Sequence, residues 1–161
     1  MKNPVSSLLA CLLLLTAAPA PAFAQRESSN IRPSSPRCEY LVSPLAIDNR
    51  EPRLSWIIDS NVRGTKQRAY QIIVASSLAG LARNKGDLWD TGKVTSSQTI
   101  QTAYRGKPLG SRQQCFWKVR VWDQNDRPST WSKPEQWAMG LMEPTDWSAQ
   151  WTGDKIGRAH V

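Results

Sequence analysis

The feature that most constrains the fold is an alternation of side chains over residues 115–122 (CFWKVRVW). Successive side chains of a β-strand point to opposite faces, so apolar and basic positions that alternate predict a strand with one buried face. The inward set is Trp117, Val119 and Val121. This segment therefore predicts a sheet whose inner face packs against a second layer.

Other short segments have the same character and are separated by turn residues. The strand predictions fall at 54–58, 69–75, 88–94, 99–104 and 131–139. Residues 76–84 predict one short helical turn at most. Six or seven short strands with almost no helix, over residues 38–141, are typical of an all-β fold, a fibronectin III or immunoglobulin-like β-sandwich.

The N-terminus has the pattern of a secretory signal peptide over residues 1–24. Lys2 precedes an apolar run at 8–18, and Ala22-Phe23-Ala24 forms an A-x-A cleavage site. The run is shorter than the roughly 20 residues of a spanning helix, so we expect export to the periplasm or medium and no membrane association after cleavage. Cys11 precedes most of the apolar run, which argues against a lipoprotein site.

Three further segments lie outside the predicted sandwich. Residues 25–37 are rich in Ser and Pro and predict a flexible linker. Residues 142–155 contain no complete element and predict the start of a linker to a missing next domain. Residues 156–161 (IGRAHV) match a common sequencing adapter translated in frame, and we hypothesise that they are an artefact.

Composition excludes several classes of chemistry. The single histidine of the 161 residues is His160, which excludes histidine triads and His/Cys zinc sites, and we expect no metal and no cofactor. The chain has 21 basic and 13 acidic residues, a net charge of +8, but the basic residues form no run or stripe. We therefore expect no nucleic-acid partner.

The acidic residues do not form an evident catalytic pair. Glycoside hydrolysis needs two carboxyl groups across the scissile bond. The two close pairs are Asp87 with Asp90 and Asp123 with Asp126, and both lie at turns, where an Asp side chain binds its own backbone. We expect these turn roles and assign no catalytic residue.

Cys38 and Cys115 remain after the signal peptide is removed. In an oxidising compartment they could form a disulfide across a long loop, which would contribute about 4 kcal/mol. The alternative is two small buried apolar side chains. The sequence leaves both interpretations open.

The eight tryptophans divide into two groups. Those within or beside predicted strands are expected in the core: Trp56, Trp89, Trp117 and Trp137. The other four have two open interpretations, docking against a neighbouring domain, which we favour, or stacking on a sugar ring: Trp122, Trp131, Trp147 and Trp151.

A series of separated motifs carries a family resemblance. They are 38–48 (CEYLVSPLAID), 52–56 (PRLSW), 67–76 (QRAYQIIVAS), 86–94 (GDLWDTGKV), 115–123 (CFWKVRVWD), 131–132 (WS) and 139–141 (MGL). In this order they resemble the N-terminal region of bacterial α-L-rhamnosidases. The resemblance implies a sandwich domain that precedes further β-sandwich domains and an (α/α)6 barrel, whose carboxylates hydrolyse terminal α-L-rhamnosides with inversion.

The sequence therefore predicts a non-catalytic N-terminal module of an exported α-L-rhamnosidase, truncated before the catalytic domain. Its expected partners are later domains of the same polypeptide and rhamnose-containing glycans. The alternative is a free-standing secreted carbohydrate-binding or adhesive module. An exposed flat row of tryptophans would favour that alternative, and an apolar patch would favour docking.

Overall fold

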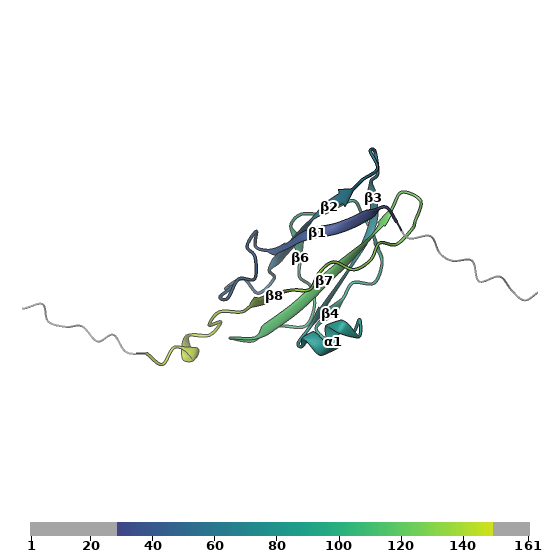
Figure 1. Ribbon diagram of the computed structural model, residues 1–161. Coiled ribbons are helices and arrows are strands. Elements are labelled where there is room, and N and C mark those ends of the chain that lie inside the picture. Colours follow the sequence, from purple (N-terminus) through teal and green to yellow (C-terminus); the bar gives the residue numbers. More distant parts are fainter. Residues whose placement is uncertain (1–28, 150–161) are drawn as a thin grey trace, which may run out of the picture.

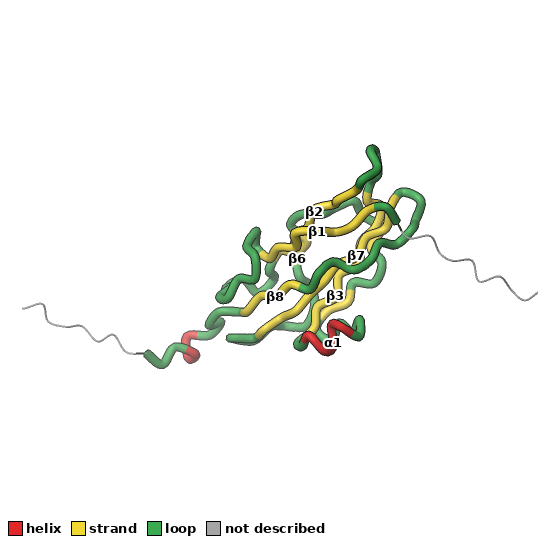
Figure 2. The backbone as a smooth tube through the Cα atoms, viewed as in Figure 1, coloured by secondary structure: helices red, strands yellow, loops and turns green. Residues whose placement is uncertain are grey.

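Two antiparallel sheets face each other in the computed structural model, which describes residues 29–149 (Figures 1 and 2). The first sheet has the order β1-β2-β6, with β1 at Ile31–Cys38, β2 at Arg53–Ser60 and β6 at Thr102–Ala103. The second has the order β4-β3-β7-β8, and β5 also pairs with β3. Its strands are β3 (Gln67–Ala75), β4 (Trp89–Asp90), β5 (Val94–Thr95), β7 (Gln114–Asp123) and β8 (Glu135–Ala138).

The core lies between the sheets and is built on tryptophan. Trp117 of β7 has no exposed surface, and Trp56 of β2 and Trp137 of β8 are at most 2% exposed. The rings of Trp56 and Trp137 meet tyrosines edge to face, with centroids 5.2 Å apart for Trp56 and Tyr70 and 6.0 Å apart for Trp137 and Tyr104. This geometry is favourable for aromatic pairs. The predicted all-β sandwich and the inward face of residues 115–122 are confirmed.

The prediction that residues 25–37 form a linker is wrong for the part from Ile31 onward. These residues form β1, which pairs with β2 from Ile31 opposite Ser60 to Cys38 opposite Leu54. The register shifts between Ser34 and Arg37, and Ser35 within this bulge has a φ of 46°. Because the bulge adds one residue, the inward positions change from odd to even numbers, which hides the period of two.

The composition of β1 also concealed it. Pro33 and Pro36 lack the amide donor that a central strand needs, yet both are buried. β1 is an edge strand of its sheet, where proline is tolerated. The strand follows Ser29, whose backbone amide donates to the carbonyl of Pro128 at 3.0 Å.

The segments predicted as strands at 88–94 and 99–104 form only two-residue strands. After β4 the chain stays beside β3 through Thr91. The amide of Thr91 donates to the carbonyl of Ile72 at 3.1 Å, and its hydroxyl accepts from the amide of Ile72 at 3.0 Å. Gly92 then adopts a φ of 58°, which turns the chain away before β5. Glycine takes this left-handed conformation without steric cost.

The predicted helical turn is α1, Leu78–Ala82. The hydroxyl of Ser77 caps it by accepting from the amide of Gly80 at 3.2 Å. Leu81 is buried against β3 and β7 residues, whereas Leu78 is 54% exposed. The chain enters the sandwich at one end, near the start of β1, and leaves it at the other (Figure 1).

Candidate interaction surfaces

Asp123, at the end of β7, organises the turn that follows. Its carboxylate is fully buried and accepts from the backbone amides of Asn125 at 2.9 Å and Arg127 at 3.0 Å. It also accepts from Nε of Arg127 at 2.9 Å and from Oγ of Ser29 at 3.1 Å. Burial raises the pKa of Asp123, but the hydrogen bonds from Arg127, Ser29 and Asn125 outweigh it, and the net shift is downward.

The remaining paired carboxylates have structural partners as well. Asp87 accepts from the amide of Ser76 at 2.9 Å and from its hydroxyl at 2.6 Å, and these bonds lower the pKa of Asp87. Asp90 accepts from the amide of Gly92 at 2.8 Å. Asp126 forms an exposed ion pair with Lys93. The predicted turn roles are confirmed for Asp90 and Asp123, whereas Asp87 binds Ser76, at the end of β3, and Asp126 binds the side chain of Lys93.

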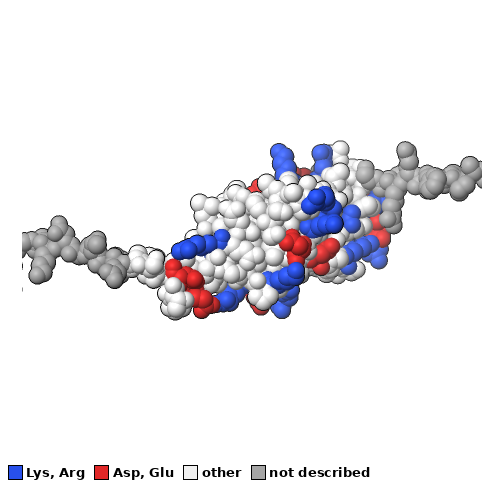
Figure 3. Space-filling view, turned by 90° about the horizontal axis from the view of Figure 1, so that it is seen from below, with Lys and Arg blue, Asp and Glu red and all other residues white. Residues whose placement is uncertain are grey.

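Residues 29–149 contain no group of three or more His, Cys, Asp or Glu side chains that could hold a metal ion. Within the same residues no helix has the length and apolar character to cross a membrane. Basic and acidic side chains are interspersed over the face seen in Figure 3. No single-sign stripe of the kind that binds nucleic acid is visible on that face.

Trp122 and Trp131, two of the four tryptophans left open by the sequence, alternate with cationic side chains on the outer face of β7. We call this row of rings and cations the ladder. The Arg120 guanidinium lies 4.9 Å from the ring centroid of Trp122 and 4.7 Å from that of Trp131. Lys93 lies over Trp122 and Lys118 over Trp131, each at 5.1 Å. Trp122 is 7% exposed and Trp131 is half-buried.

The ladder has a structural consequence for both sets of side chains. Burial lowers the pKa of Lys118 and of Arg120, and the electron-rich ring faces supply part of the solvation that water would give. Rings that stack on cations have less surface to offer a sugar. Trp122 and Trp131 are thus packed on the outer face of their own sheet. Of the other two candidates, Trp147 is 60% exposed in the C-terminal segment, and Trp151 lies outside the described residues.

Residues 129–132 hold the ladder in place without forming a strand, although the sequence placed Trp131 and Ser132 in the last strand. The amides of Ser129 and Ser132 donate to the carbonyls of Val121 and Val119, both at 2.8 Å. Their hydroxyls accept from the amides of the same two valines, at 3.0 and 3.1 Å. Each serine therefore satisfies both backbone groups of one β7 residue, which a periodicity analysis does not detect.

Cys38 and Cys115 lie in the same core cluster, one in each sheet. Both are free thiols in the structure and are at most 1% exposed. Burial raises the pKa of each thiol to about 12. They are positioned as small apolar side chains.

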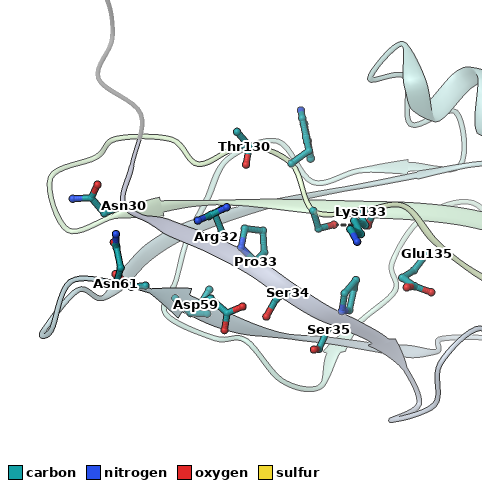
Figure 4. Close-up of a pocket in the computed structure, with 15 residues that line it drawn as sticks. Asn30, Arg32, Pro33, Ser34, Ser35, Asp59, Asn61, Thr130, Lys133 and Glu135 are labelled. Carbon is teal, nitrogen blue, oxygen red and sulfur yellow. Dashed lines mark hydrogen bonds between the residues drawn. The ribbon is translucent and has the colours of Figure 1, made fainter.

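A groove of about 970 Å³ runs between β1 and residues 130–135 (Figure 4). Charges of both signs line it, from Arg32, Asp59, Lys133 and Glu135. Ser34 and Ser35 add hydroxyl groups. Apolar side chains line it as well, from Pro33, Pro36, Ile58 and Trp131, so the groove presents both polar and apolar surface to a ligand. Sequence reasoning missed it because it depends on β1.

The C-terminal segment is bound to the sandwich as it leaves. The amide of Met142 donates to Oγ of Ser111 at 2.8 Å, and the same hydroxyl donates to Asp146. Arg50 forms an ion pair with Glu143. Pro144–Asp146 form a short 3-10 helix with a reciprocal capping box. The described part of the predicted linker, residues 142–149, is therefore attached to the domain at several points.

Two facing antiparallel sheets around a tryptophan core define an immunoglobulin-like β-sandwich domain. The profile of the family described as "Rha78A-like, N-terminal immunoglobulin domain" matches residues 33–143. This chain belongs to that family.

The similar proteins are α-L-rhamnosidases. The α-L-rhamnosidase of Streptomyces avermitilis is 47% identical over 123 residues, which are 76% of this chain and 12% of the relative. The α-L-rhamnosidase of Alteromonas sp. (strain LOR) is 43% identical over 128 residues, 78% of this chain and 14% of the relative.

Solved structures agree with this relationship. The crystal structure of the Streptomyces avermitilis α-L-rhamnosidase complexed with L-rhamnose is similar with a TM-score of 0.70 over 74% of this chain and 11% of that one. The α-L-rhamnosidase of Dictyoglumus thermophilum has a TM-score of 0.74 and 41% identity over 77% of this chain and 14% of that one. The chain thus spans about an eighth of the length of these relatives.

Proposed function

We propose that this chain is the non-catalytic N-terminal module of an exported α-L-rhamnosidase, an enzyme that hydrolyses terminal α-L-rhamnosides. The observation that carries the proposal is the match of residues 33–143 to an N-terminal domain family, together with two similar α-L-rhamnosidases of which the matched segment covers only 12% and 14%. Asp87 and Asp123 are engaged by partners within the domain, which is consistent with a non-catalytic role for both carboxylates.

The module would act by fixing the direction in which the chain continues. Ser111 and Arg50 hold residues 142–146 against the sandwich through three side-chain contacts, to Met142, Asp146 and Glu143. A segment bonded in this way loses the freedom of a flexible tether. The next domain therefore starts from a defined position, and Trp147 offers it a 60% exposed aromatic ring.

Export belongs to the same proposal. Its support is the signal-peptide pattern at residues 1–24, which lie outside the described residues. Expression of the full chain followed by N-terminal sequencing of the secreted product tests this part, and a mature N-terminus at Gln25 is the expected result.

The enzymatic part is tested with a chimera. Residues 29–149 replace the similar N-terminal domain of the Streptomyces avermitilis α-L-rhamnosidase, and a deletion variant lacks that domain. Hydrolysis of an aryl α-L-rhamnoside is measured for both and for the 161-residue chain alone. We expect activity from the chimera, weaker activity or poor folding from the deletion variant, and none from the chain alone.

Two outcomes contradict the proposal. Hydrolysis by the chain alone would make this domain catalytic. A folded chimera that hydrolyses the rhamnoside no faster than the deletion variant would show that this domain has no role in assembly of the enzyme.

A second candidate function, binding of rhamnose-containing glycans, is favoured by the groove beside β1, whose lining includes Trp131. Charged and hydroxyl groups line this groove, and Asp59 and Lys133 are placed to exchange hydrogen bonds with sugar hydroxyls. Titration calorimetry of the chain with a rhamnose oligosaccharide tests it. Binding that is lost in Lys133→Ala would support the free-standing module, whereas no heat of binding would leave the enzyme module as the sole proposal.

A further inference from the structure

An exposed apolar surface lies on the connection between β1 and β2. Its four side chains are Tyr40, Leu41, Val42 and Leu45, which are 51%, 55%, 60% and 78% exposed. Together we call them the apolar loop. Single apolar residues on a surface are ordinary, but a contiguous group marks an interaction site.

Hydrogen bonds of the neighbouring residues Cys38 and Glu39 fix the start of the apolar loop. The Glu39 carboxylate accepts from the backbone amide of Arg53 at 2.7 Å and from two nitrogens of its guanidinium, at 3.0 and 2.7 Å. These hydrogen bonds lower the pKa of Glu39. The backbones of Cys38 and Leu41 exchange hydrogen bonds at 3.0 and 2.9 Å.

The backbone of the loop is also strained. Glu39, Tyr40 and Ser43 have φ values of 48°, 62° and 47°. Left-handed conformations of residues other than glycine have a free-energy cost and persist where surrounding contacts enforce them. Here the enforced conformation turns apolar side chains outward although buried neighbours, Pro44 and Ile47, show that the same loop also reaches the core.

The loop is joined to the segment through which the chain leaves. The carbonyl of Pro44 accepts from the amide of Ala138 at 2.8 Å. Ile47 accepts from the amide of Gly140 at 2.8 Å and pairs with Met139 in a parallel bridge. Figure 1 shows the β1–β2 connection and the C-terminal segment at the same end of the sandwich. The segment 138–140, through which the chain leaves the sandwich, therefore lies beside the apolar loop.

We propose that the apolar loop, Tyr40, Leu41, Val42 and Leu45, is the docking surface for the domain that follows residue 149 in the same polypeptide. This inference rests on the proposed function and gives it a contact surface. We expect the partner surface to be apolar. The four side chains of the apolar loop are at least half exposed and carry no charge that could form an ion pair. Relatives that extend far beyond this domain supply such a neighbour: the chain covers 12% of the Streptomyces avermitilis enzyme.

Amide hydrogen exchange tests the proposal in the unmodified sequence. Exchange at residues 40–46 is compared between the 161-residue chain and the chimera with the Streptomyces avermitilis enzyme. We expect exchange in this loop to slow about tenfold or more in the chimera, because docking excludes water and suppresses local opening. An active chimera whose loop exchanges as fast as in the chain alone overturns the inference and leaves the proposed function intact.

Matched leucine variants provide a second readout. Leu41→Ser removes a side chain that is 55% exposed on the loop, and Leu78→Ser removes one that is 54% exposed on α1. We expect Leu41→Ser to lower the unfolding temperature of the chimera by several degrees without changing that of the chain alone. Leu78→Ser should change neither. Equal effects of the two variants in the chimera would overturn the docking surface.

The remaining outcomes are also decisive. A folded chimera that hydrolyses a rhamnoside no better than the deletion variant overturns the proposed function, and the inference with it. Concentration-dependent dimers of the chain alone, abolished by Leu41→Ser, would assign the loop to a second copy of the chain and overturn docking within one polypeptide.

Discussion

The charged carboxylate of Asp123 stabilises the turn that follows β7. Asp123→Asn keeps the shape but removes a buried carboxylate that accepts from Asn125, Arg127 and Ser29. We expect a loss of about 2–4 kcal/mol in the free energy of unfolding at neutral pH. Urea denaturation measures it. Asp126→Asn, which removes an exposed ion pair in the same turn, should cost about 1 kcal/mol or less, and an equal loss in the two variants would contradict the assignment.

The lowered pKa of Asp123 also predicts a pH dependence. A carboxyl group whose pKa is lower in the folded than in the unfolded state stabilises the fold above the unfolded value, about 3.9, and this contribution disappears as the pH falls through the folded pKa. Unfolding free energies of the wild type should therefore drop below about pH 4. The drop should be smaller in Asp123→Asn, and parallel curves for the two proteins would refute this source of acid lability.

The two core cysteines should be unreactive while the domain is folded. Burial raises the pKa of Cys38 and Cys115 to about 12, so few thiolates exist at pH 8. In the chain from Gln25 onward, which contains only these two cysteines, we expect a thiol reagent to label both on unfolding and neither before. If the unfolded chain takes no label until a reductant is added, the disulfide left open by the sequence is present instead.

At the scale of elements, the strands with regular alternation could be predicted and the irregular ones could not. Residues 115–122 carry their period of two intact, and β7 follows it. β1 combines two buried prolines with a bulge at Ser35, so neither composition nor period identified it. The pairing of Ser129 and Ser132 with β7 is likewise a side-chain contact that a strand pattern does not encode.

β1 should contribute to stability as a core strand does. Ile31 has no exposed surface, and truncation of a buried isoleucine leaves a cavity that costs about 2–5 kcal/mol. We expect Ile31→Ala to destabilise the domain by that amount in urea denaturation. Arg32→Ala, at the adjacent exposed position, should be nearly neutral. A neutral Ile31→Ala would restore the linker interpretation of this segment.

The serine contacts predict a further loss of stability at this scale. Ser129→Ala and Ser132→Ala each leave a buried valine amide of β7 without its side-chain acceptor, which costs about 1–3 kcal/mol. Thr130→Ala, between them and exposed, should have little effect. Thermal unfolding of the three variants measures these losses of stability. If Thr130→Ala destabilised the domain as much as the two serine variants, the segment would act only by packing.

At the scale of the whole molecule, the surface that we propose for docking differs from the tryptophans that the sequence suggested. Trp122 and Trp131 were candidates because no strand pattern buried them, yet cations cover their rings. Trp147 keeps its exposure. The apolar loop escaped notice because apolar residues are ordinarily expected in the core, and the left-handed backbone at Tyr40 and Ser43 cannot be read from the sequence.

The central claim is that this domain leads a longer enzyme, and the genome of the source organism tests it most directly. One long read across the codons that follow Trp151 is sufficient. The account predicts an open frame that continues for several hundred codons into sequence similar to the remainder of the α-L-rhamnosidases, without the six codons of residues 156–161. A stop codon soon after Trp151 in the genomic frame would contradict it.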